Sequence, residues 1–348
     1  MKEFYNNKKV LITGDTGFKG SVLSYILMLM GADVTGYALC PPTNPSMYDT
    51  LKLDKQIRHM EGDIRDFVHI QSVFRKIQPE IVFHLAAQPL VRESYQNPVY
   101  TYETNVLGTV YMCECIRKNG CVKSFLNVTT DKVYQNDEED KPFLEDMHLN
   151  GRDPYSNSKS CSELVTYSYL QSFYKNMHTA VSTARAGNVV GGGDFAANRI
   201  IPDCVRAAVG GNDIIVRNPH SIRPYQHVLE PLYVYLMIAK EQYQSAEKQG
   251  NYNVGPDDES CITTGELADL FCKYWGEGMK WVDRYDGGPY EAGFLKLDCT
   301  KLKETFAWQP RWNIEQAVEK SVEWYKAFYN HEDMGEITKR QIGEMFDV

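Results

Sequence analysis

The segment that most limits the fold is a glycine-rich stretch directly after a short apolar run near the N-terminus. The apolar run covers residues 10–13, and Gly14, Gly17 and Gly20 follow it in TGDTGFKG. Glycine at these places permits a tight turn, close backbone approach to a pyrophosphate and packing of the next helix on the strand. An apolar helical run continues to Met30. This arrangement predicts a dinucleotide-binding strand–turn–helix unit.

The rest of the first half repeats this alternation of β-branched runs and helical patterns. The predicted strands are 10–13, 33–38, 81–85, 125–129 and 180–185, and the predicted helices are 20–30, 66–76, 102–118 and 155–174. Alternation of this kind gives βαβ units with parallel strands buried on both faces. We expect an α/β fold with a doubly wound parallel sheet of the Rossmann type.

After Arg185 the pattern changes to the glycine-rich loop GNVVGGGDF and then to shorter elements. Helices are predicted from 202 and over 229–244, 264–275 and 314–329. We expect a smaller C-terminal α/β substrate lobe over the C-terminal ends of the strands, where open α/β sheets bind ligands. The predicted division is a dinucleotide-binding domain at 1–186, joined by some later segments, a substrate lobe at 187–330 and a fraying polar tail at 331–348.

Composition excludes several classes of protein. Lys and Arg number 37 against 46 Asp and Glu, a formal net charge of −9, which disfavours nucleic-acid and anionic-membrane binding. No apolar run reaches the roughly 18 residues of a spanning helix, and the N-terminus lacks the apolar run of a signal peptide. The nine cysteines form no zinc-type pairs, so we expect reduced thiols in a cytoplasmic protein without a metal site.

A tyrosine and a lysine in DPYSNSK are the first catalytic candidates. Tyr155 and Lys159 are four residues apart at the start of a predicted helix and so share one face. A phenol is a poor base at neutral pH, but a neighbouring ammonium and a nicotinamide cation favour the phenolate. Tyr155 would then take a hydroxyl proton while hydride leaves the same carbon. An ordinary surface contact between the two side chains is the alternative.

A second candidate group follows the predicted strand at 125–129 in NVTTDKVY. Thr130 is placed to hydrogen-bond a reacting oxygen at the end of this strand. Asp131 and Lys132 are an adjacent acid and base without an evident structural task there. A helix cap or a loop salt bridge is the alternative.

These motifs together resemble a known family. The stretches TGDTGFKGS, GDIRD, FHLAAQPLVRESYQNP, ARAGNVVGGGDF, NRIIPD and RNPHSIRPYQHVLEPL, within about 9–329, are similar to extended short-chain dehydrogenase/reductases, and among them to nucleotide-sugar 4,6-dehydratases. The usual family member carries Glu where Lys132 stands, and lysine there is expected of the branch that acts on CDP sugars. As a base Lys132 must first lose its proton; otherwise it acts as a cation beside the enolate.

The resemblance implies an NAD-dependent hydro-lyase acting on a nucleotide sugar, with a CDP sugar favoured. Tyr155 takes the C4 hydroxyl proton, Asp131 protonates the leaving C6 hydroxyl, and the stored hydride returns to C6. The end of the second predicted strand, 37–40, holds neither an acid nor an arginine, so NADP stays open beside NAD. Asp63 is placed to reach the adenine, with a loop cap as the alternative.

The predicted site has three parts. The catalytic residues are Thr130, Asp131, Lys132, Tyr155 and Lys159. The cofactor-binding residues are Gly14, Thr16, Gly17, Phe18, Gly20, Asp63, Ile64, Leu85, Ala86, Ala87, Asn105, Tyr155 and Lys159, with Asn105 as the structural asparagine of the family. The substrate-binding residues are Gln88, Ser94, Asn188, Arg199, Arg217, Arg223 and Arg284, and Arg223 is the strongest diphosphate candidate because a guanidinium matches phosphate oxygens.

Three alternatives stay open at this point. They are a dehydratase for another nucleotide, a nucleotide-sugar 4-epimerase, and a dinucleotide-sensing protein without catalysis. His84 and His227 lie in apolar runs and are expected to be core residues. The resemblance also implies a homodimer or higher homo-oligomer, paired through the predicted helices at 102–118 and 155–174.

Overall fold

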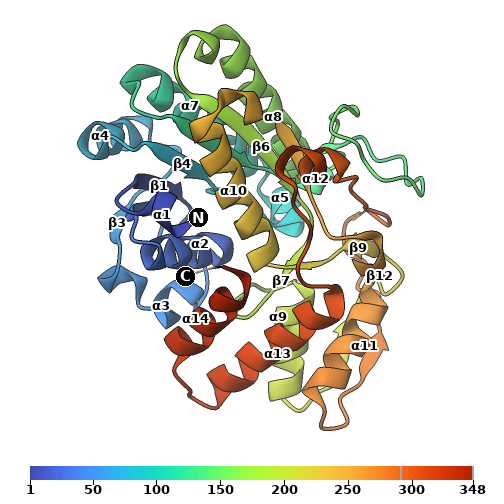
Figure 1. Ribbon diagram of the computed structural model, residues 1–348. Coiled ribbons are helices and arrows are strands. Elements are labelled where there is room, and N and C mark those ends of the chain that lie inside the picture. Colours follow the sequence, from blue (N-terminus) through green and yellow to red (C-terminus); the bar gives the residue numbers. More distant parts are fainter. Residues whose placement is uncertain (291, 347–348) are drawn as a thin grey trace.

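In the computed structural model, which describes residues 1–290 and 292–346, seven parallel strands form a central sheet in the order β11-β6-β5-β4-β1-β2-β3 (Figure 1). The strands are β1 (Lys9–Thr13), β2 (Asp33–Ala38), β3 (Arg58–Glu61), β4 (Ile81–His84), β5 (Ser124–Val128), β6 (Ala180–Ala186) and β11 (Asn251–Val254). The predicted doubly wound parallel sheet is confirmed. Strand order reverses beside β1, and a crevice at such a reversal is where open sheets bind ligands.

Two strands of this sheet, β3 and β11, were missed by the sequence patterns. They lie at its two edges, and their sequences, RHME and NYNV, lack the apolar run of a central strand. An edge strand pairs on one side only and is less enclosed, so its residues need not be uniformly apolar. In β3 no residue is fully buried, whereas every residue of β4 and β5 is.

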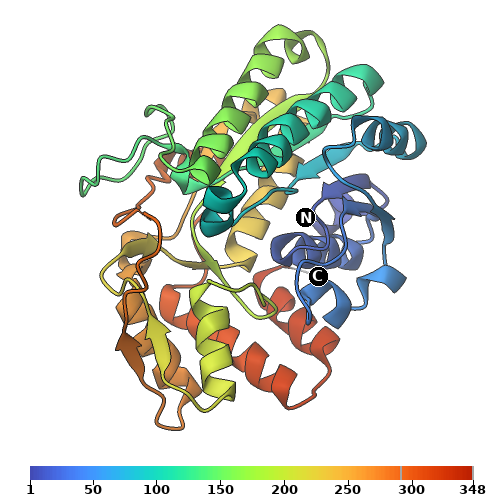
Figure 2. The same ribbon diagram turned by 180° about the vertical axis from the view of Figure 1, so that it is seen from behind.

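Helices cover both faces of the sheet (Figures 1 and 2). On one face α2 (Phe18–Leu29) and α10 (Leu229–Gln244) share a core with Val10 and Ile12 of β1. On the other, α4 (Phe67–Ile77), α7 (Gly108–Asn119) and α8 (Pro154–Ser172) pack with Leu11, Val82 and Phe125. The predicted helix at 102–118 is split into α6 (Pro98–Tyr102), a π-helical turn η2 (Glu103–Leu107) and α7.

Apart from α10 and β11, which belong to the central sheet and its covering helices, much of the chain after β6 forms a second layer beside the C-terminal ends of the strands. Its two-stranded pairs are β7 (Val189–Val190) with β10 (Gln226–His227), β9 (Ile222–Pro224) with β12 (Cys261–Thr263), and β8 (Ile214–Val216) with β13 (Trp281–Asp283). Its larger helices are α9 (Ile200–Val209), α11 (Thr264–Trp275) and α13 (Ile314–Tyr329), and shorter helices elsewhere are α1 (Lys2–Tyr5), α3 (Met47–Thr50), α5 (Val91–Gln96) and α12 (Thr300–Phe306). β7 lies inside the segment predicted to be only a glycine loop.

The prediction of a fraying tail at 331–348 is wrong for its described part. Helix α14 (Met334–Met345) begins at Asp333, whose carboxylate accepts from the backbone N–H groups of the first turn. Met334, Ile342 and Met345 are buried in the main core. Most of the charged residues that suggested fraying lie on the outer face of this helix, whereas the polar residues Thr338 and Gln341 are buried. Among the described residues, no helix combines the length and the apolar character that crossing a membrane requires.

Candidate active site

A cleft of about 1690 Å³ opens at the C-terminal ends of the central strands, and residues of both the sheet side and the second layer line it. Of the predicted cofactor-binding residues, all but Asn105 line it. They are Gly14, Thr16, Gly17, Phe18, Gly20, Asp63, Ile64, Leu85, Ala86, Ala87, Tyr155 and Lys159. The structure therefore brings together, on one side of the cleft, segments from four different strand–helix units.

The glycine loop meets the steric demands that its sequence indicated. Gly14 has a φ of +77°, and a Cβ there would lie 2.8 Å from the Ala86 nitrogen. A Cβ on Gly20 would overlap the Gly14 carbonyl. Gly17 is the N-cap of α2, so the N–H groups of the first helical turn are directed at the cleft. The loop presents backbone donors without side chains in the way, the arrangement that a diphosphate needs.

Asp63 and Asn105 support the cofactor side in different ways. Asp63 forms an ion pair with Arg65 at 2.7 Å, and that contact lowers the pKa of the Asp63 carboxyl. Asn105, predicted as the structural asparagine of the cofactor side, is buried and lies outside the cleft lining. Its Oδ1 accepts from Gln88 N at 2.8 Å, and its Nδ2 donates to Gln88 O and to Ser158 Oγ. Asn105 thus ties the loop after β4 to helix α8.

The predicted acid is deeply buried at the end of β5. Thr130 Oγ1 donates to Asp131 Oδ1 at 2.9 Å, and the other carboxylate oxygen, Oδ2, has no hydrogen-bond partner among the described residues. Only 1% of Asp131 is exposed, and this burial raises the pKa of its carboxyl. Burial favours the protonated form, which is the form that donates a proton, whereas the Lys132 charge and the Thr130 hydrogen bond oppose this effect. Lys132 follows it in the cleft lining.

Tyr155 and Lys159 lie one turn apart on α8, as predicted, and both line the cleft. Burial raises the pKa of Tyr155 to about 12, and its contact with the Thr130 side chain opposes that rise. Burial also lowers the pKa of Lys159 to about 8, opposed by the Glu163 charge. Lys159 Nζ donates to the Val128 carbonyl at 3.1 Å, which fixes the ammonium beside the end of β5.

A buried ion pair below this group was not found from the sequence. Glu163, one turn after Lys159, pairs with Arg185 of β6 at 3.0 Å, and both side chains are almost fully enclosed. The Glu163 carboxylate also accepts from Thr129 and Thr183, while Arg185 donates to the Tyr134 hydroxyl. The only sequence signal was a glutamate four residues after Lys159 and an arginine within an otherwise apolar strand.

The predicted substrate residues divide into two groups. Gln88, Asn188, Arg199, Arg217 and Arg223 line the cleft. The structure does not bring the other two described residues, Ser94 and Arg284, to that lining. Ser94 is fully buried, and its hydroxyl donates to the Val91 carbonyl within α5. Arg284 is exposed and continues the β13–β8 pairing through its backbone N–H to Val216 O.

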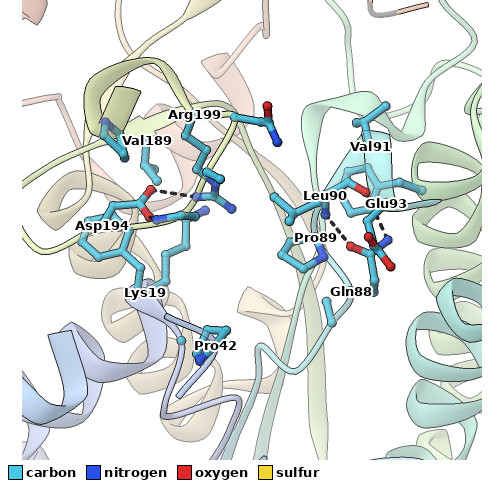
Figure 3. Close-up of a pocket in the computed structure, with 18 of the residues that line it drawn as sticks. Lys19, Pro42, Gln88, Pro89, Leu90, Val91, Glu93, Val189, Asp194 and Arg199 are labelled. Atoms are coloured by element: carbon cyan, nitrogen blue, oxygen red, sulfur yellow. Dashed lines mark hydrogen bonds and ion pairs between the residues drawn. The ribbon is translucent and has the colours of Figure 1, made fainter. Parts of the chain in front are cut away.

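A lysine of the glycine loop also lines the cleft. Lys19, in the first turn of α2, points toward Asp194 and Arg199, whose ion pair at 3.1 Å lies across the cleft from Pro89 and Leu90 (Figure 3). Burial lowers the pKa of Lys19 to about 8, and the Arg199 charge acts in the same direction. The available sequence signal was a lysine between the second and third glycines of the phosphate loop.

Two histidines occupy the core, as predicted. His84 Nδ1 is 2.7 Å from Thr13 Oγ1, and burial lowers its pKa to about 3. Burial likewise lowers the pKa of His227 to about 3, and its ring packs edge-on against Trp312. Within the described chain, no group of His, Cys or carboxylate side chains is arranged to hold a metal ion.

Comparison with known proteins identifies the family. Residues 11–321 match the family described as GDP-mannose 4,6 dehydratase. This chain belongs to that family. The chain is 43% identical to the CDP-glucose 4,6-dehydratase of Salmonella typhimurium, over 99% of this chain and 97% of the relative.

Solved structures share the fold of this 4,6-dehydratase family member. One is a dTDP-glucose 4,6-dehydratase from Bacillus anthracis in complex with NAD, with a TM-score of 0.77 and 21% identity over 93% of this chain and 98% of that one. Another is a UDP-glucose 4-epimerase from Thermotoga maritima with UDP-glucose, with a TM-score of 0.78 and 23% identity over 92% and 99% of the two chains. At these identities the likeness concerns the fold.

Proposed function

We propose that the chain is an NAD-dependent CDP-glucose 4,6-dehydratase, a hydro-lyase that forms CDP-4-keto-6-deoxyglucose and water. The observation that carries this proposal is the convergence of Tyr155, Lys159 and a buried Asp131 on one cleft beside a phosphate loop. The likeness to the Salmonella enzyme over nearly the whole chain supports the choice of a CDP sugar.

The residues of the loop fit a dinucleotide. The N–H groups at the start of α2 and the side-chain-free approach at Gly14 and Gly17 would hold its diphosphate. Residues near Asp63 would border the adenosine, and Tyr155 with Lys159 would border the nicotinamide end. The chemistry that NAD supplies when bound is temporary storage of the hydride from C4 until its return at C6. NAD in the related Bacillus structure supports NAD as the cofactor.

Tyr155 and Lys159 would act on the C4 hydroxyl of the sugar. Because burial raises the pKa of Tyr155, the phenol loses its proton only if nearby positive charge stabilises the phenolate. The Lys159 ammonium, fixed by the Val128 carbonyl, supplies positive charge on the same helix face. The phenolate then removes the hydroxyl proton as C4 is oxidised, and the Thr130 hydroxyl, which donates to Asp131 in the structure, would turn its hydrogen bond to the reacting oxygen.

Asp131 and Lys132 would carry out the loss of water. The C4 ketone acidifies the C5 proton, and Lys132, in the cleft lining, takes that proton or stabilises the enolate as a cation. The protonated Asp131 carboxyl gives its proton to the C6 hydroxyl, which leaves as water. An epimerase needs no acid at C6, so the buried Asp131 favours the dehydratase.

A homodimer is the assembly that we propose for this enzyme. The outer surfaces of η2 and α8 carry exposed apolar side chains, among them Leu107, Leu164 and Tyr167 with 44%, 55% and 58% exposure. Burying such a face against a second copy removes apolar surface from water. Elution at the monomer mass in size-exclusion chromatography would contradict this assembly.

Mass spectrometry of product mixtures tests the reaction and the nucleotide together. The full chain with NAD is incubated separately with CDP-, UDP-, GDP- and dTDP-glucose, without added reductant. We expect one water to be lost from CDP-glucose alone. Loss from another nucleotide sugar would overturn the CDP assignment, and a product of unchanged mass that NMR identifies as the C4 epimer would replace the dehydratase by an epimerase.

A further inference from the structure

A carboxylate at the mouth of the cleft holds two arginines that come from its opposite sides. Asp286, in the segment after β13, contacts Arg92 of α5 through both of its oxygens, at 2.9 Å and 2.8 Å. Arg217, directly after β8, lies 3.7 Å from the same carboxylate. These three residues, which we name the Asp286 clasp, all line the cleft.

The two arginines belong to different structural layers. Arg92 lies on α5, which follows β4 of the central sheet and packs against α8. Arg217 lies in the second layer, where its guanidinium donates to Asn198 Oδ1 at 2.7 Å and contacts Asp203 at 3.6 Å. The Asp286 clasp therefore connects the two sides of the cleft. Breaking the contacts of Asp286 with one of the arginines would let these two sides move apart.

The segment that carries Asp286 is also attached at its far end. Arg223, the deepest predicted diphosphate ligand, donates to the Ala292 carbonyl. The Glu138 carboxylate accepts from the N–H groups of Gly293 and Phe294, at 2.9 Å and 3.0 Å for one of its oxygens. These hydrogen bonds fix residues 292–294, which lie outside the cleft lining.

Carboxylate and phosphate compete for the same donors. An arginine fork pairs with two oxygens of either group, so a side-chain carboxylate on cleft arginines occupies the place of a phosphate. The hydrogen bonds from Arg92 lower the pKa of Asp286 to about 2, so the group is an anion throughout the physiological range. The side chains of Arg92 and Arg217 are each 28% exposed, so an entering anion can reach their guanidinium groups.

We infer that Arg92 and Arg217 form a second anion subsite for the diphosphate of the nucleotide sugar, and that Asp286 is an internal carboxylate that this diphosphate displaces. The inference rests on the proposed function for the identity of the diphosphate ligand. It adds Arg92 to the substrate-binding residues and makes Asp286 a specificity residue that disfavours weakly charged ligands.

Asp286→Asn is the informative variant. Asparagine keeps the acceptor for the Gly288 N–H, which Asp286 accepts at 3.0 Å, but removes the charge that competes with phosphate. The matched control is Asp283→Asn, on the same segment, since Asp283 is exposed and has no ion pair in the described part of the chain. Arg92→Gln and Arg217→Gln remove the donors themselves.

Calorimetric titration of the NAD-loaded full chain with CDP, inorganic pyrophosphate and cytidine measures the effect without turnover. For Asp286→Asn we expect CDP and pyrophosphate to bind about two- to fivefold more tightly, the range of an exposed ion pair, with cytidine unchanged. Either arginine variant should bind both anions about five- to tenfold more weakly, because charge-assisted hydrogen bonds are lost.

Unchanged or weaker anion binding by Asp286→Asn would overturn the inference, as would an equal gain in Asp283→Asn or no anion binding by any form. A clasp that only closes over substrate predicts the opposite sign, weaker binding without Asp286. The binding of pyrophosphate and CDP is measured without any reaction taking place. Anion binding that follows the expected order, without water loss from any nucleotide sugar, would therefore keep the subsite and reject the proposed function.

Discussion

The two sides of the cleft are stabilised by different means. On the sheet side, Asp131 and Lys159 are enclosed at the end of β5 and on α8, and neutral or fully buried partners hold them. On the facing side, Arg199 and Arg217 are partly exposed; Arg199 pairs with Asp194 of its own loop, and Arg217 lies near the carboxylates of Asp203 and Asp286. The residues proposed for catalysis thus lie on rigid elements. The residues proposed to bind substrate are charged side chains whose carboxylate partners an anionic ligand can replace.

The largest expected effect concerns the sheet side. Tyr155→Phe removes the only atom that would exchange the C4 hydroxyl proton, so kcat for water loss should fall about 10²- to 10⁴-fold. Tyr167→Phe, on the exposed face of the same helix, is the control and should leave kcat unchanged. A Tyr155→Phe enzyme within a factor of about three of wild type would remove Tyr155 from the mechanism.

Among these variants, loss of the buried Glu163–Arg185 ion pair should have the largest effect on the free energy of unfolding. Glu163→Gln leaves the Arg185 guanidinium enclosed without its counter-charge, which should lower the free energy of unfolding by about 3–5 kcal/mol. Denaturant unfolding followed by circular dichroism measures this loss. A loss below about 1 kcal/mol would show that water or a rearranged partner satisfies Arg185.

Replacement of Asp131 should slow the elimination of water but not the oxidation at C4. Asp131→Asn should slow water loss about 100-fold, as expected for loss of a general acid, while the signal of reduced nicotinamide still develops. In wild type the protonated acid is lost as pH rises through the raised pKa of Asp131, so elimination should slow toward alkaline pH. If the rate of elimination by Asp131→Asn decreases at alkaline pH in the same way, another group, such as Lys159, causes that decrease.

On the facing side, binding should change more than chemistry. Arg223→Gln removes charge-assisted hydrogen bonds to the diphosphate, so KM should rise about tenfold while kcat changes little. Arg284→Gln is the control, because Arg284 is outside the cleft lining, and steady-state kinetics should show an unaltered KM. Equal effects of the two variants would point to general electrostatic attraction and not to a bound guanidinium.

The smallest effect belongs to an exposed ion pair far from the cleft. Glu323 of α13 and Arg340 of α14 form such a pair, with 40% and 52% of their side chains exposed. Glu323→Gln should change the free energy of unfolding by less than about 1 kcal/mol, because water screens the charges. A loss similar to that of Glu163→Gln would contradict the contrast between buried and exposed pairs.

The sequence by itself indicated the central sheet, the phosphate loop and the Tyr155–Lys159 pair. These depend on local signals: apolar runs in β1, β4 and β5, glycines where a Cβ does not fit, and side chains four residues apart on a helix. The helix at 314–329 was predicted with its observed bounds, since its periodicity and cap are contained in its own residues.

Only the tertiary structure decided which polar residues face the cleft and which strands close the sheet. Ser94 and Arg284 have suitable chemistry but lie outside the lining, whereas Lys19, Arg92 and Asp286 reach it. The polar edge strand β11 joins the sheet through pairing with β6, and α14 is held by contacts with distant helices. The direction of a polar side chain and the partner of an edge strand depend on residues far apart in the chain, so no local pattern contains them.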